Sequence, residues 1–125
     1  MELIKHVNAY MALSALSKEK YSYKDAYSII KLKNELKEDF EFFGCKEREI
    51  VAKTSKKGTA KGNYFEFADS TAKEEYERAM LELSILEVKD VNRITIRPPE
   101  KITPEMLEAL EAYVEFKEEQ DAGTS

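Results

Sequence analysis

His6 and Cys45 are the side chains best suited to act as a nucleophile, a base or a metal ligand, and each is alone of its type. A zinc site needs about four nitrogen, sulfur or oxygen ligands, usually with repeated Cys or His residues at short spacing. A thiol nucleophile needs a base against it, and nothing in the sequence brings His6 and Cys45 together. We therefore expect no metal, no cofactor and no covalent nucleophile.

The segment GTAKGN at 58–63 combines glycines with a lysine, as phosphate-binding loops do. It lacks the G-x-x-x-x-G-K-[ST] spacing that lets backbone N–H groups and a lysine surround a phosphate. The surrounding residues 54–62 have no apolar periodicity. We interpret them as a mobile loop.

Carboxylates are plentiful, and four near the end of the sequence recur at a helical spacing: Glu108, Glu111, Glu115 and Glu118. A catalytic carboxylate pair needs opposed positions in a pocket that pushes the two pKa values apart. One line of glutamates on a helix offers no such opposition. It indicates a solvated face or a surface that meets a basic partner, and we expect no enzyme.

Charge divides the chain into three regions. Residues 1–45 are neutral overall, residues 46–61 are strongly basic and residues 62–125 are strongly acidic, within a total of −5. Such polarity can support head-to-tail association between copies, although two differently charged solvated surfaces give the same pattern.

The basic region carries the one signal for nucleic acid. Phosphate neutralisation by lysines next to stacking aromatics such as Tyr64 and Phe65 is a physically sensible combination. Glu47 and Glu49 interrupt the cluster, and the whole chain is acidic. A nucleic-acid-associated accessory protein that uses residues 46–61 is therefore the alternative function. The basic residues involved are Lys46, Arg48, Lys53, Lys56, Lys57 and Lys61.

The elements that must position these groups follow from apolar periodicity and helix caps. Ser22 is placed to cap a long second helix, and Thr71 with Glu74 matches the capping-box spacing of a third. Thr103 followed by Pro104 marks the start of a fourth helix. The expected elements are helices at 2–16, at 23 to about 54, at 71–87 and from 103 through about 114, with short strands at 64–67 and 93–97.

We accordingly predict a mainly helical α+β fold in the order α-α-β-α-β-α, a helical hairpin with a long second helix and two short strands. Residues 1–119 form one domain, and 120–125 are a disordered tail. No apolar run approaches the ~18 residues that span a bilayer, and the first residues lack a signal-peptide pattern. We expect a cytoplasmic protein that does not enter a membrane.

The second helix is the most informative element. Ile29, Leu36, Phe43 and Ile50 recur every seven residues on one stripe, while Tyr23, Tyr27 and Ile30 lie to one side. At 1.5 Å per residue the helix is about 48 Å long, whereas a compact domain of this size has a radius of gyration of ~14 Å. The helix must bend, break near Gly44, or project.

A projecting apolar stripe needs a partner, and we expect a second copy of the chain or another protein to supply it. The residues predicted to form this interface are Phe40, Phe42, Phe43, Ile50 and Val51.

Three segments occur in a characteristic order: ALSALSKEKYSYKDAYSIIKLKNELKEDFEFFGCKEREIVAKTSKKG, then a helix ending LELSILEV, then KITPEMLEALEAYVEF. Through these segments the chain resembles small uncharacterised proteins of phages and prophages of Gram-positive bacteria, over roughly residues 9–116. The resemblance implies a phage context, in which other phage proteins are candidate partners beside a second copy of the chain, and it assigns no site residues. The function predicted is non-enzymatic protein–protein association in an assembly or accessory role.

Overall fold

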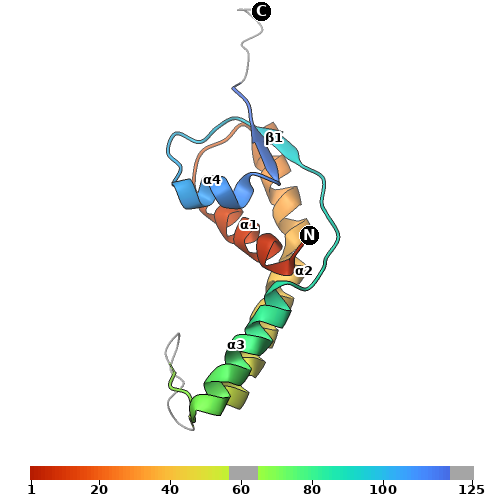
Figure 1. Ribbon diagram of the computed structural model, residues 1–125. Helices are drawn as coiled ribbons and strands as arrows, with labels where there is room; N and C mark the ends of the chain where they lie inside the picture. The colour runs from red at the N-terminus through yellow and green to blue at the C-terminus, as the bar shows by residue number, and fades with distance from the viewer. Residues whose placement is uncertain (57–64, 119–125) are drawn as a thin grey trace, which may run out of the picture.

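The structure is a computed structural model that describes residues 1–56 and 65–118. In this part of the chain a long helix carries a compact head on its first half and a single helix beside its second half (Figure 1). The elements in chain order are α1 (Leu3–Leu16), α2 (Tyr23–Thr54), α3 (Ser70–Ser84), β1 (Ile94–Ile96), α4 (Pro104–Leu110) and β2 (Val114–Phe116). The mainly helical α+β class predicted from the sequence is confirmed.

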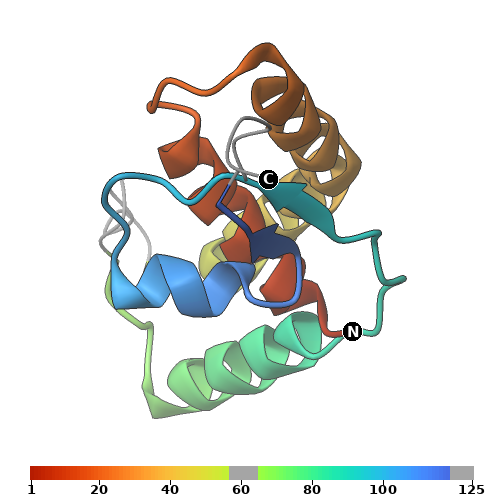
Figure 2. The ribbon, with the colours of Figure 1, turned by 90° about the horizontal axis from the view of Figure 1, so that it is seen from above.

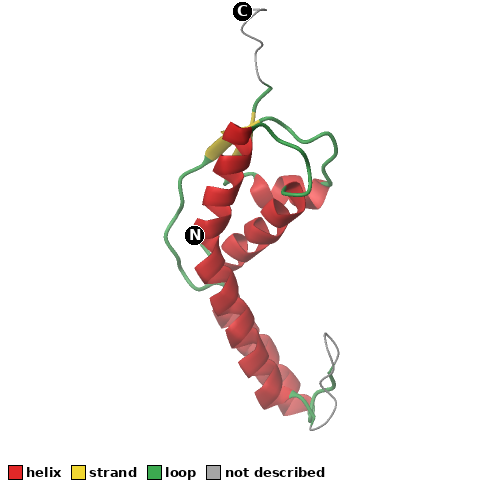
Figure 3. Ribbon diagram, turned by 180° about the vertical axis from the view of Figure 1, so that it is seen from behind, coloured by secondary structure: helices red, strands yellow, loops and turns green. Residues whose placement is uncertain are grey.

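Helix α2 runs the length of the molecule, with the short strands near its start and α3 beside its second half (Figure 3). The hydroxyl of Ser22 caps it by accepting a hydrogen bond from the backbone N–H of Asp25 at 3.2 Å. The helix continues through Gly44 to Thr54, as the periodicity predicted. Its second half is not left uncovered, because α3 packs along it.

The buried side chains form two clusters along α2. Helix α1 packs on α2 along one side and on α4 along another, which encloses the main cluster (Figure 2). The second, smaller cluster forms where α3 meets the other two long helices, around Leu3, Val7 and Phe43. Members of the main cluster are Ala9, Ala12, Leu13, Leu16, Ile29, Leu32, Leu36, Ile96, Leu110, Tyr113 and Val114.

The segment expected to form the first strand does not form one within the described residues. Phe67 makes a single isolated bridge with Ser55, and Tyr64 lies outside the described residues. The rings of Phe65, Phe67 and Tyr76 form a cluster with centroids 5.1 to 5.5 Å apart. The aromatic pattern therefore reflects packing against the first turns of α3, a contact that needs no strand.

Helix α3 begins one residue before the predicted start, with a different cap. The Oδ1 atom of Asp69 accepts a hydrogen bond from the backbone N–H of Ala72 at 2.7 Å. The capping box predicted from Thr71 and Glu74 is therefore wrong, because Asp69 caps the helix two residues earlier and Thr71 lies inside its first turn. The helix ends at Ser84, three residues short of the predicted end.

The predicted strand at 93–97 is present as β1, but its partner is the end of the segment expected to be helical. Val114, Glu115 and Phe116 pair in parallel with Ile94, Thr95 and Ile96. Helix α4 starts at Pro104 behind the predicted Thr103 cap and ends at Leu110. The element order is thus α-α-α-β-α-β, and the expected line of glutamates is divided, since Glu115 lies on β2 and Glu118 beyond it.

Candidate functional site

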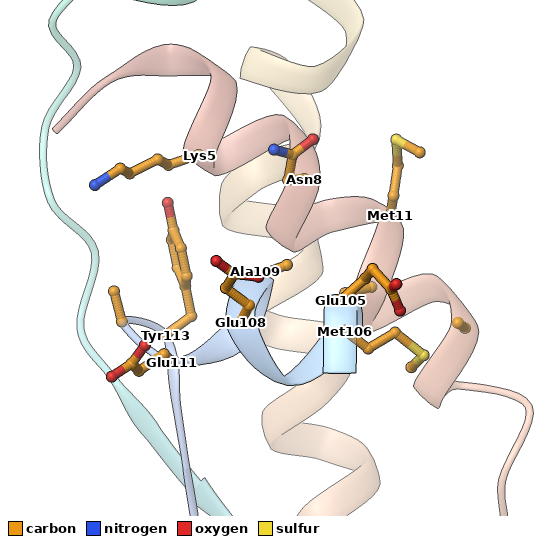
Figure 4. Close-up of a pocket in the computed structure, with 12 residues that line it drawn as sticks. Lys5, Asn8, Met11, Glu105, Met106, Glu108, Ala109, Glu111 and Tyr113 are labelled. Carbon is orange, nitrogen blue, oxygen red and sulfur yellow. The ribbon is translucent and has the colours of Figure 1, made fainter. Parts of the chain in front are cut away.

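An open groove of about 1000 Å³ lies between α1 and α4 (Figure 4). Small side chains create it, because alanines on both walls leave unfilled space between the two segments. Ala12 is buried in the main cluster, whereas Ala15 and Ala112 are exposed. The lining comprises Lys5, Asn8, Met11, Ala12 and Ala15 from α1, and Glu105, Met106, Glu108, Ala109, Glu111, Ala112 and Tyr113 from α4 and the residues after it.

Two methionines give the groove an adaptable apolar end. Met11 stands on α1 and Met106 on α4, both at the end of the groove away from Tyr113 (Figure 4). Met11 is 56% exposed, a large fraction for an apolar side chain. Unbranched thioether side chains adjust their shape to irregular partners, and for this reason methionines are common on protein-binding surfaces.

The charged residues of the groove are mostly acidic. Glu105, Glu108 and Glu111 are all exposed, and Lys5 is the one lysine or arginine in the lining. Among residues 1–56 and 65–118, no lysine or arginine makes an ion pair with these three glutamates. The groove therefore combines an apolar lining with an unneutralised negative edge. We call it the acidic groove.

A buried polar network fixes the inner wall of the acidic groove. Nδ1 of His6 lies 2.7 Å from the hydroxyl of Tyr113, and Nε2 of His6 lies 2.8 Å from the backbone oxygen of Lys89. A carbonyl oxygen can only accept, so in the neutral ring Nε2 carries the proton and Nδ1 accepts from the tyrosine. The carboxylate of Asp39 lies 3.8 Å from Nε2, and the sulfur of Met1 contacts the Tyr113 oxygen.

Burial raises the pKa of the Tyr113 hydroxyl well above the ordinary range, and the negative charges of Asp90 and Asp39 raise it further. The phenol therefore stays protonated into the alkaline range, and its single hydrogen has two acceptors within reach, Nδ1 of the neutral His6 ring and the sulfur of Met1. Both ring nitrogens of this histidine are satisfied inside the protein. The network ties four separate segments together and holds one wall of the groove, as a structural cross-link does.

The structure distributes the predicted interface residues unevenly. Phe43 is buried, and the ring of Phe40 packs on Tyr10 with centroids 4.3 Å apart. Ile50 and Val51 are half-buried on the part of α2 that runs beside α3. Helix α3 thus gives much of the stripe an intramolecular partner, and of the five residues Phe42 is the one classed as exposed.

The predicted basic residues do not share one face of α2. The ammonium of Lys46 lies 3.2 Å from the carboxylate of Glu49 and also stands over the ring of Phe42. Arg48, two residues on, projects from roughly the opposite side of the helix, and Lys53 occupies the last turn. Lys56 follows the helix, and its backbone N–H donates a hydrogen bond to the backbone oxygen of Glu66. Lys57 and Lys61 lie outside the described residues.

Cys45 is an exposed free thiol on α2. Within residues 1–56 and 65–118, no three or more His, Cys, Asp or Glu side chains come close enough to hold a metal ion together. The helices of this part of the chain include none with the length and apolar character required to span a membrane.

Comparison with protein families, with curated proteins and with solved structures found no match. The acidic groove therefore has to be interpreted from its own residues. The groove is not recognisable in the sequence, because its two walls, residues 5–15 and 105–113, lie about a hundred positions apart in the chain. The alanines that widen the groove do not indicate a binding site in the sequence, because alanine is also the residue with the highest helix propensity and is common in any helix.

Proposed function

We propose that this chain is a non-catalytic protein of phage or prophage origin that binds a helical segment of another protein in the acidic groove. The observation that carries the proposal is an open groove with an apolar lining and three unneutralised glutamates at its edge. The phage context rests on the sequence resemblance, and with it we propose an assembly or accessory role in the bacterial cytoplasm.

The shape of the groove suits an amphipathic helix. Such helices lay an apolar face into a groove and anchor it with side chains spaced three and four residues apart. Alanines let the backbone of the bound helix approach closely, and Met11 with Met106 can adjust to its side chains. A small substrate would be poorly enclosed here, because the groove is open and lies on the surface.

The charge of the groove selects the partner. Glu105, Glu108 and Glu111 favour a helix that carries lysines or arginines beside its apolar face. Opposite charges at the edge of an interface raise the association rate and exclude acidic competitors. Because these carboxylates are exposed, added salt should weaken the attraction.

A peptide titration tests the proposal. A dye that reports polarity is attached to Ala112→Cys, an exposed position in the groove, in a chain that also carries Cys45→Ser. Two designed helical peptides with the same apolar anchors, one with lysine flanks and one with glutamate flanks, are then added. We expect saturable binding of the lysine peptide and at least about tenfold weaker binding of the glutamate peptide.

A charge placed inside the groove provides the matched control. Met11→Lys should abolish binding of the lysine peptide, whereas Leu81→Lys, at an equally exposed position on the outer face of α3, should leave it unchanged. Equal binding of both peptides, or undiminished binding to the Met11→Lys protein, would show that the groove is not the binding site.

A further inference from the structure

The most exposed apolar side chains of α2 form a ridge near its start. Tyr23 is 98% exposed, Tyr27 61% and Ile30 56%. Their spacing of four and three residues places them on one face of the helix. That face is opposite the buried one, which carries Ile29, Leu32 and Leu36. We call these three residues the α2 ridge.

The α2 ridge stands in a basic setting. Lys20, Lys24 and Lys31 are exposed around it, and none of the three makes an ion pair with another described side chain. Apolar residues at the spacing i, i+4 and i+7, with lysines beside them, form the anchor pattern expected of a helix that docks in an acidic groove.

Two acidic side chains near the start of α2 are held by the rest of the head. A carboxylate oxygen of Asp25 accepts a hydrogen bond from the backbone N–H of Arg97 at 3.1 Å. The carboxylate of Glu19 accepts one from the backbone N–H of Glu100 at 3.2 Å. Both acids are thus occupied by the segment after β1. The exposed acids Glu35 and Glu38 follow the ridge further along α2, so the basic character is concentrated around Tyr23 and Tyr27.

The ridge of a chain cannot fill the groove of the same chain. Helix α1 packs on α2 along one side and on α4 along another, so it separates the α2 ridge from the groove (Figure 2). The ridge points away from α1, since its residues lie opposite the buried face of α2. The two surfaces therefore lie on opposite sides of the head.

We propose that the α2 ridge of one copy docks in the acidic groove of the next copy. This inference rests on the proposed function, for which it names the partner. The two surfaces are complementary in shape, one convex and one grooved, and in charge, one basic and one acidic. Each copy offers both surfaces on opposite sides, so the contact is head-to-tail and generates rings or filaments.

The association should be weak for each contact. Three side chains anchor the ridge, and a large aromatic residue buries roughly 150–250 Å². The area buried then falls below the ~1,200–2,000 Å² of a stable interface. We expect assembly that increases with protein concentration and decreases with salt.

Sedimentation velocity of the full chain, with two variants and their mixture, tests the inference. Tyr27→Glu removes the ridge and leaves the groove intact, whereas Met11→Lys does the opposite. Wild type should form species larger than two chains at high concentration, and each variant alone should remain monomeric. An equal mixture should form a species of two chains and nothing larger, because one functional ridge meets one functional groove.

The outcomes separate this inference from the proposed function. Leu81→Lys should assemble like wild type, and circular dichroism should confirm that every variant is folded. A monomeric wild type, or a mixture that stays monomeric, overturns head-to-tail docking even where the lysine peptide still binds. Failure of the peptide to bind, by contrast, overturns the groove itself.

Discussion

The hydroxyl of Tyr113 is hydrogen-bonded to His6 across 107 positions of the sequence, with 2.7 Å between the phenolic oxygen and Nδ1. The contact joins the segment after α4 to the first turns of α1. It therefore fixes Tyr113, which lies at the end of the acidic groove away from Met11 and Met106 (Figure 4), to the helix that forms the other wall. Stability of the head and geometry of the groove consequently depend on the same pair of side chains.

Tyr113→Phe should lower the free energy of unfolding by about 1–3 kcal/mol, because Nδ1 of a buried histidine loses its donor. Urea denaturation followed by circular dichroism measures the loss. Tyr23→Phe is the matched control, since the Tyr23 side chain is 98% exposed and should change stability little. Equal stability of the Tyr113→Phe protein and wild type would mean that the network does not hold the head together.

Stability should fall at alkaline pH. Burial raises the pKa of Tyr113 above its unfolded value near 10, so from about pH 10 upward the unfolded chain loses a proton that the folded chain keeps. Each such group lowers the free energy of unfolding by up to about 1.4 kcal/mol per pH unit. Burial also raises the pKa of Tyr21, although this side chain is more exposed.

Denaturation at pH 9 and at pH 11 separates the contribution of Tyr113 from that of Tyr21. The Tyr113→Phe protein should lose clearly less stability than wild type between these two values, since it lacks the buried phenol. A decline of the same size in both proteins would assign the alkaline effect to other groups.

Thr103→Ala should destabilise α4 and weaken groove binding. The hydroxyl of Thr103 accepts a hydrogen bond from the backbone N–H of Met106 at 3.2 Å, and loss of such a cap costs about 0.5–2 kcal/mol. A helix of seven residues has little else to hold its first turn. Thr103→Ser keeps the cap oxygen and should restore both stability and peptide binding; an alanine protein that binds like wild type would contradict the argument.

Phe42→Glu distinguishes two possible sites of self-association. Phe42 belongs to the interface predicted from the stripe of α2, and it is 42% exposed. Docking of the α2 ridge in the acidic groove uses the first turns of α2, whereas Phe42 lies on its second half. Sedimentation of the Phe42→Glu protein should therefore match wild type, and a shift to monomer would return the interface to the second half of α2.

Sequence alone determined the elements whose signals are local. Apolar residues at helical spacing behind a Ser22 cap specify α2 over Tyr23–Thr54, and Thr103 with Pro104 specifies the start of α4. The alternation of Arg93 to Arg97 specifies β1. In each case the preference for helix or strand depends on side chains within a few positions of one another, so the local sequence pattern predicts the element.

Tertiary structure decided the features that depend on distant contacts. Leu110, Tyr113 and Val114 have helical spacing, yet Val114–Phe116 is a strand. It is a strand because Tyr113 is buried against His6 and the next three residues pair with β1. Among the described residues, 65–67 make only an isolated bridge between Phe67 and Ser55, while the rings of Phe65 and Phe67 pack on Tyr76.

The acidic groove belongs to the same class of feature. Ala12 and Ala15 become one of its walls only when α4 packs on α1 with Ala109 and Ala112 facing them. The exposed ridge of Tyr23, Tyr27 and Ile30 was visible as a group beside the main stripe, but its exposure depended on which face of α2 the other elements cover. Helix α1 and β1 pack on the first half of α2 and α3 packs on the second half, and long-range packing rather than local periodicity decides which face each of them covers.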